Sequence, residues 1–158
     1  MAELNRIGLD PKSSSELAAL LNELLANYSV FYQNVRGYHW NIKGEKFFEL
    51  HLKFQELYNN LLIKIDDVAE RILTLGYTPE HRYTVYTTIS AIHEMKEVSD
   101  GFAAVQNILD SFATLIRLQR VILAKSAAIN DEGTNALMSD YIREQEKLVW
   151  MYSAFLGK

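Results

Sequence analysis

Apolar residues recur at steps of three and four along most of this chain, and that spacing is typical of one face of an α-helix. Such runs occupy residues 17–35, 50–75, 102–123 and 137–155. The first run follows a Ser-Ser-Ser-Glu sequence, which favours a helix start, and the second is followed by Gly76, which suits a helix C-terminus. The pattern therefore predicts four long helices, the first starting after the serines and ending near residue 40.

The segment from residue 77 to about residue 98 interrupts this pattern, and we expect it to contain one short helix at residues 89–93. A connection of this length joins helices that are parallel or distant, not neighbours in a hairpin. Only two prolines and seven glycines occur, and no run alternates as a strand does. We therefore predict an all-α fold: a four-helix bundle with one long crossover at residues 14–158, after a short tail at residues 1–13.

Composition narrows the chemistry. The chain has 158 residues, the size of one domain, and no cysteine, which excludes disulfides, thiolate metal sites and thiol catalysis. A metal here must be held by nitrogen and oxygen. No apolar run reaches the roughly 18 residues of a membrane span, and no leader precedes the first helix, so we expect a soluble cytoplasmic protein. With 20 acidic and 16 basic residues, the chain has no overall attraction to nucleic acid.

Ligand-type side chains share one side of the second predicted helix. At 100° per residue, a sector of about 100° contains His51, Gln55, Asp66 and Glu70. This sector lies roughly 100° around the helix from its main apolar stripe, and it also carries Tyr58 and Leu62, which a solvated face does not usually do. The arrangement indicates a candidate metal site.

Spacing along the helix shows that one chain does not complete such a site. His51 and Asp66 are separated by about 22 Å of helix, whereas ligands lie roughly 2 Å from a first-row metal ion. Two copies of this helix packed antiparallel across a two-fold axis would solve the problem, because such a contact pairs residue i with j and j with i. The numbering fits one register, since 51 plus 70 and 55 plus 66 both equal 121. His51 then faces Glu70 of the partner subunit, Gln55 faces Asp66 of the partner subunit, and His39 can complete the cluster.

A metal site inside one bundle is the alternative. Ferritin-type di-metal sites need a Glu-x-x-His pair from each of two helices. None of the four histidines has an acidic residue three positions before it. The residue pattern therefore disfavours a bundle-interior carboxylate site.

The sequences "RGYHWNIKGEKFFELH" and "KIDDVAERILTLG", together with the "DEGT" turn before the last helix, resemble the Dps family of mini-ferritins from the first helix to the last residue. The resemblance implies a ferritin-like four-helix bundle with a short crossover helix, and a hollow dodecamer. It also implies a ferroxidase that oxidises Fe2+ to Fe3+ with hydrogen peroxide, stores iron and protects against oxidative damage. The implied iron ligands and catalytic residues are His39 and His51 of one subunit with Asp66 and Glu70 of its two-fold neighbour. Trp40 lies beside the site, as a packing residue.

Gln55 departs from the family pattern, which has an acidic ligand four residues after His51. A carboxamide can still donate an oxygen to a metal ion, but it brings no compensating charge. We expect weaker iron binding or a changed occupancy, with one metal position more affected than another. An alternative function follows, in which a cage with weakened ferroxidase activity acts mainly as a structural or DNA-shielding assembly. A monomeric helical interaction protein is a third hypothesis.

Several further residues have two interpretations. Asp66 and Glu70 also fit a solvated face paired with Arg71. Asp131 fits either a helix cap or, with Glu132 and Asp140, an acidic ring that draws ferrous ions into a cage.

Three other positions are expected to have no metal role. His81 and His93 are predicted to be loop and short-helix residues of the crossover that bind no metal, and Asp67 to be a surface residue.

The termini carry few uncompensated cations. Arg6 and Lys12 are offset by Glu3 and Asp10, and the C-terminus offers Lys158. Binding to DNA needs several such cations on one surface. We therefore expect DNA binding to be weak or absent, with association with the bacterial nucleoid left open.

Overall fold

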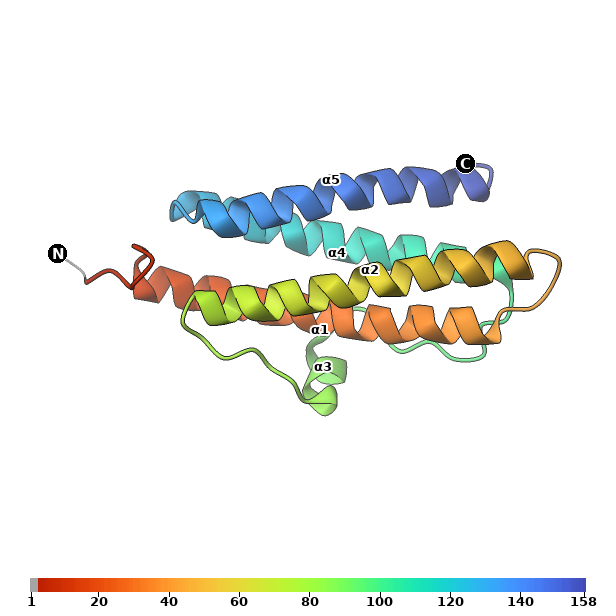
Figure 1. Cartoon of the computed structure of the whole chain (residues 1–158), viewed down its shortest axis with the longest axis horizontal. Helices are drawn as coiled ribbons and strands as arrows, with labels where there is room; N and C mark the ends of the chain where they lie inside the picture. Colours follow the sequence, from red (N-terminus) through yellow and green to blue (C-terminus); the bar gives the residue numbers. More distant parts are fainter. Residues whose placement is uncertain (1–2) are drawn as a thin grey trace.

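The computed structural model describes residues 3–158 and, within that range, contains five helices and no strand beyond an isolated bridge between Lys43 and Asp100. The helices are α1 (Pro11–Asn41), α2 (Phe47–Thr74), α3 (Tyr83–Ile89), α4 (Gly101–Ala128) and α5 (Glu132–Phe155) (Figure 1). The prediction of an all-α fold is confirmed.

The four long helices form a bundle of two antiparallel pairs, α1 with α2 and α4 with α5 (Figure 1). Helices α2 and α4 begin at the same end of the bundle, so they run parallel and the chain between them must return along the bundle's full length. This is the long crossover that the sequence predicted. It carries α3, which lies against α1 on the outside of the bundle.

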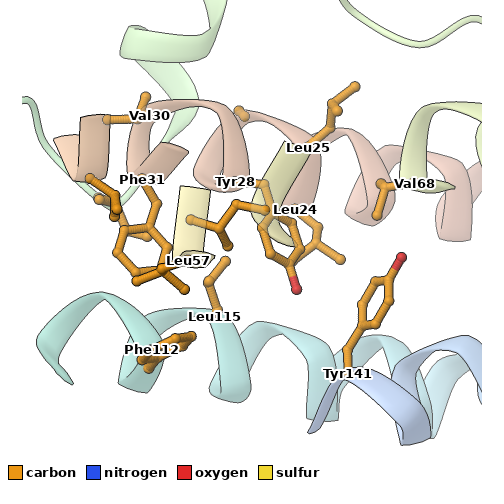
Figure 2. Packing of buried hydrophobic residues seen from close by; sticks show 14 of the residues in the cluster. Leu24, Leu25, Tyr28, Val30, Phe31, Leu57, Val68, Phe112, Leu115 and Tyr141 are labelled. Atoms are coloured by element: carbon orange, nitrogen blue, oxygen red, sulfur yellow. The ribbon is translucent and has the colours of Figure 1, made fainter. Parts of the chain in front are cut away.

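The core lies between the predicted stripes. The α2 residues that are buried there include Leu50, Phe54, Leu57, Leu61, Val68 and Ile72. From α1, Phe31 points toward α4, where its ring meets the ring of Phe112 edge to face at 5.3 Å (Figure 2). Not every apolar residue of the predicted stripes is internal, because Phe102 and Trp150 are more than half exposed.

Helix α1 begins earlier than the serine run suggested. The Asp10 carboxylate accepts a hydrogen bond of 2.8 Å from the Ser13 backbone N–H, and Pro11 occupies the first turn, where its missing N–H has no consequence. Ser14 is buried within the helix. The Asp-Pro cap, and not the serines, therefore sets the start of α1, and residues 11–13 belong to its first turn.

The C-terminus of α2 is followed, as predicted, by a glycine that ends the helix, Gly76. Its φ of +95° is a left-handed conformation that glycine adopts without strain. The N–H of Tyr77 donates to the carbonyl of Ile72 at 3.1 Å, and the N–H of Gly76 donates to that of Leu73 at 2.9 Å. This pair of bonds is a Schellman ending, which satisfies carbonyls of the last turn.

The short crossover helix lies at Tyr83–Ile89, so its expected position at residues 89–93 was wrong. The reason is the buried Asn27 of α1, whose side-chain oxygen accepts hydrogen bonds from the N–H groups of Ala91 and Ile92 at 3.0 and 3.1 Å. Asn34 likewise binds the carbonyl of His93. These polar groups find partners on α1, so the segment does not need helical hydrogen bonds.

None of the described helices combines the length and the hydropathy needed to cross a membrane.

Candidate metal site

His39 and His51 lie together where α1 ends and α2 begins. The Nδ1 atom of His39 is 2.5 Å from the backbone carbonyl oxygen of His51. The Nδ1 atom of His51 is 2.7 Å from the backbone carbonyl oxygen of His39. The two rings are stacked, with centroids 3.7 Å apart and planes 12° from parallel. The sequence predicted that these two residues belong to one site, and the fold brings them into direct contact.

The reciprocal contacts fix the chemistry of both rings. A carbonyl oxygen only accepts hydrogen bonds, so each Nδ1 must carry the proton and donate it. In a neutral imidazole the other nitrogen, Nε2, then keeps its lone pair. Histidines that bind metal ions usually have this arrangement, in which the second nitrogen donates to a carbonyl or carboxylate. Both histidines can therefore bind a metal ion through the lone pair of Nε2.

Aromatic side chains surround this pair. The ring of Phe47 stacks on His51 with centroids 4.9 Å apart, and the ring of Tyr58 meets His39 edge to face at 5.3 Å. Trp40, expected to pack, is instead 56% exposed in the single chain. The guanidinium of Arg36 lies 4.8 Å from the centroid of its ring.

Asp66 and Glu70 are exposed on α2, four to five turns beyond His51. In the part of the chain that the structure describes, neither of them joins the histidines, and no group of three or more histidine and acidic side chains is close enough to hold a metal ion. A single chain therefore presents half of the predicted ligand set at each end of one helical face.

Arg71 does not pair with Asp66 or Glu70. It donates to the carboxylate of Asp131 at 2.7 Å and to the hydroxyl of Thr134 at 2.9 Å. Asp131 is 2% exposed and also accepts from the Thr134 N–H at 3.0 Å, which caps α5. Of the two interpretations of Asp131, the helix cap is confirmed.

Large apolar side chains cover the α2 face that carries the candidate ligands, and the sequence reasoning named only Leu62 among them. They are Phe48 (85% exposed), Leu52, Leu62, Ile63 and Leu73. A hollow of about 500 Å³ beside Asp66 continues this surface toward Pro79 and Tyr86. Helical spacing alone would have found the other four, since they fall in about the same sector as His51 and Glu70. Exposed apolar side chains do not stabilise a monomer, and a surface of this kind is typical of a protein–protein interface.

Three comparisons with known proteins agree on the family. A ferritin-like domain matches residues 18–158. A DNA protection during starvation protein of Porphyromonas gingivalis is 38% identical over 151 residues, which are 96% of this chain and 95% of that protein. The Dps protein of Vibrio cholerae O1 superposes with a TM-score of 0.96 at 55% identity, covering 99% of this chain and 98% of the other. The chain belongs to the Dps family of ferritin-like proteins. This membership supports a general role in iron handling and oxidative protection.

A second structural match agrees with this assignment. The Dps protein of Bacillus brevis superposes with a TM-score of 0.89 at 32% identity, covering 92% of this chain and 97% of the other. The Vibrio cholerae protein is described as belonging to a superfamily of ferritin-like diiron-carboxylate proteins.

The interior of this Dps chain holds neutral polar groups. The Tyr28 hydroxyl donates to the side-chain oxygen of Gln119, whose nitrogen donates to Gln145 at 2.7 Å, and the nitrogen of Gln145 donates back to Tyr28 at 2.6 Å. All three side chains are buried, and burial raises the pKa of Tyr28. A closed hydrogen-bond ring of this kind offers no carboxylate to a cation.

Gln55 lies exposed on α2, one turn after His51. Its neighbour Glu56 pairs with Lys53 at 2.8 Å and points about 100° away around the helix. Glu56 therefore does not replace the acidic side chain that the family resemblance leads us to expect at the position of Gln55.

Proposed function

We propose that this Dps chain forms a ferroxidase whose sites are shared between two-fold-related subunits. His39 and His51 of one subunit and Asp66 and Glu70 of the partner subunit bind ferrous iron as substrate. Hydrogen peroxide oxidises the iron, and the ferric product is stored inside a hollow, dodecameric cage. The protective effect is the removal of both ferrous iron and peroxide.

The observation that carries this proposal is the reciprocal hydrogen bonding of His39 and His51. Two histidines in contact are often packing residues, but packing alone does not require both Nδ1 protons to point to backbone carbonyls. That arrangement leaves both Nε2 lone pairs available and anchors one edge of each ring before any metal binds. It also explains why one end of the ligand set is preorganised within a single chain.

The stacking favours two iron positions over one. A metal ion binds roughly 2 Å from an imidazole nitrogen, along a lone pair that lies in the ring plane. For rings 3.7 Å apart and nearly parallel, an ion midway between them would lie almost as far out of each plane as a metal–nitrogen bond is long. Each histidine therefore serves its own ion. Two ferrous ions supply the two electrons that, with two protons, reduce one peroxide molecule to two water molecules.

The apolar face of α2 supports the same subunit arrangement as the ligands. The antiparallel register that joins His51 to Glu70 of the partner subunit pairs positions whose numbers add up to 121. Two exposed apolar residues, Phe48 and Leu73, also fall into register with each other across this axis. Ile63 likewise faces Tyr58 of the partner subunit. An isologous contact therefore buries apolar surface on both sides of the ligands.

Gln55 favours a second candidate function. In the same register it faces Asp66 of the partner subunit, where it adds an oxygen but no negative charge. If the loss of charge leaves the second iron position empty, the cage acts mainly as a structural or DNA-shielding assembly in the cytoplasm. With a formal net charge of −4, such shielding rests on weak, multivalent contacts with DNA.

Peroxide-dependent iron oxidation distinguishes the two functions. Assembled protein is titrated with ferrous iron without oxygen, peroxide is added, and ferric absorbance is followed. We expect rapid oxidation that His39→Ala/His51→Ala reduces at least 100-fold. His93→Ala is the matched control, because His93 is exposed on the crossover. Oxidation no faster than in the double variant would refute the ferroxidase and leave the shielding function.

A further inference from the structure

The candidate site contains a column of aromatic rings that the ligand set does not explain. Phe47 stacks on His51 with planes 21° apart, His51 stacks on His39, and Tyr58 closes the column edge-on against the far ring. The ring of His51 is therefore covered on both faces, by Phe47 on one side and by His39 on the other.

The backbone contacts do not by themselves hold His51. A single hydrogen bond from Nδ1 restrains one edge of the ring, but the ring can still tilt about that bond. Tilting moves Nε2, because this atom lies off the axis of the Nδ1 hydrogen bond. Contact across both faces opposes this tilt. The ring of Phe47 is the part of the column that contacts His51 and is not itself a candidate ligand.

The start of α2 places Phe47 over His51. Phe47 is the first residue of the helix and lies four positions before His51, so the two side chains share one helical face. Its N–H donates to the carbonyl of Gly44 at 3.1 Å, and Lys46 at the cap position makes no side-chain capping bond. The tight turn at Gly44 thus determines where this ring lies. Phe48, next in sequence, is 85% exposed.

We infer that Phe47 is a positioning residue for metal binding at His51: its ring closes the open face of the imidazole and keeps Nε2 aimed at one of the two iron positions. The inference rests on the proposed function, since it assumes that His51 binds metal. It predicts a selective effect, because the ring of Phe47 touches His51 and is separated from His39 by the His51 ring.

Cobalt(II) tests this without the oxidation reaction. Its binding is followed by visible absorption in wild type, Phe47→Ala, Phe47→Leu and Phe47→Tyr. We expect alanine to weaken the His51-dependent position roughly tenfold to 100-fold, the range found for residues that orient metal ligands. Leucine, which has bulk but no flat face, should restore little, and tyrosine should restore most of the affinity. The His39-dependent position should change less than threefold.

A metal-free measurement tests the same point. Exchange of the histidine C2 hydrogen, read by mass spectrometry, should become faster at His51 in Phe47→Ala but not at His93. Phe102→Ala is the matched control, because Phe102 is half exposed and stacks on Phe155, outside the candidate site.

The outcomes separate the two proposals. If His51→Ala loses a cobalt position and Phe47→Ala binds as wild type does, Phe47 has no positioning role, although the metal site stands. If His51→Ala binds as wild type does, the metal site and the positioning role both fail. If Phe47→Leu and Phe47→Tyr lose the same cobalt affinity, the side chain at this position only fills space, and the positioning role of Phe47 is overturned.

Discussion

Arg71 donates a 2.7 Å hydrogen bond to the carboxylate of Asp131, across the bundle from α2 to the α4–α5 turn. This pair is nearly buried, with side-chain exposures of 19% and 1%. It removes Arg71 from competition for Asp66 and Glu70, which form no ion pair within the described residues. Those two carboxylates thus stay available for cations from outside the chain.

Arg71→Ala should therefore destabilise the fold without supplying or removing a metal ligand. It leaves the Asp131 charge buried with only Thr134 as a partner, and we expect a loss of about 3 kcal/mol in the free energy of unfolding. Urea unfolding measures this. Arg120→Ala, which breaks the exposed pair with Glu146, should cost less than about 1 kcal/mol. Similar losses in both variants would contradict the assignment of a buried pair.

Gln55→Glu should tighten iron binding at one of two positions. The new carboxylate adds a negative charge within a few ångströms of the ion, and we expect at least a tenfold higher affinity, with faster peroxide-dependent oxidation. Anaerobic titration with ferrous iron measures both positions. Glu56→Gln is the control, since this side chain points away from the candidate site. Unchanged affinity in Gln55→Glu would show that position 55 is not a ligand.

Cysteines placed at Phe48 and Leu73 should join two subunits. The chain has no cysteine of its own, so any cross-link reports the introduced pair. In the antiparallel register, each cysteine faces the other position of the partner subunit, and oxidation or a short thiol cross-linker should give covalent dimers on a non-reducing gel. Each single variant should remain monomeric on the gel. Dimers from the single variants alone would require a different register.

Alkaline pH should weaken the fold through its buried tyrosines. Burial raises the pKa of Tyr38 to about 12, and it also raises the pKa values of Tyr28 and Tyr152. Since the folded pKa lies above the unfolded value near 10, the stabilisation is complete below pH 10 and is lost as the pH rises toward 12. Relative to Tyr38→Phe, wild type should lose about 1.4 kcal/mol per pH unit in that window. Urea unfolding at pH 9, 10 and 11 measures the difference, and parallel curves for the two proteins would refute it.

The helices of this chain are a local property of its sequence. The apolar stripe of α2 and the glycine ending at Gly76 were both found from spacing and residue type, because a helix must hide one face and needs a left-handed residue to end. The start of α1 was misplaced because two signals, the serines and the Asp-Pro cap, lay within four residues of each other. Only the capping geometry distinguished them.

Contacts between distant segments were not accessible in this way. The position of α3 depends on Asn27 and Asn34, which bind the crossover from more than 55 residues away. The partner of Arg71 was not found from the sequence for the same reason. Pairing with Asp66 and Glu70 was one interpretation, because those residues are its neighbours in sequence, whereas its partner in space, Asp131, caps the start of α5.

The sequence by itself determined the set of candidate ligands and the fact that one chain does not complete the site, because helical rise and the length of a metal–ligand bond are fixed quantities. The tertiary structure decided the state of the two histidines. Their stacking, their reciprocal hydrogen bonds and the cover of Phe47 arise only when the end of α1 meets the start of α2, since they depend on backbone carbonyls and ring planes, which residue type does not specify.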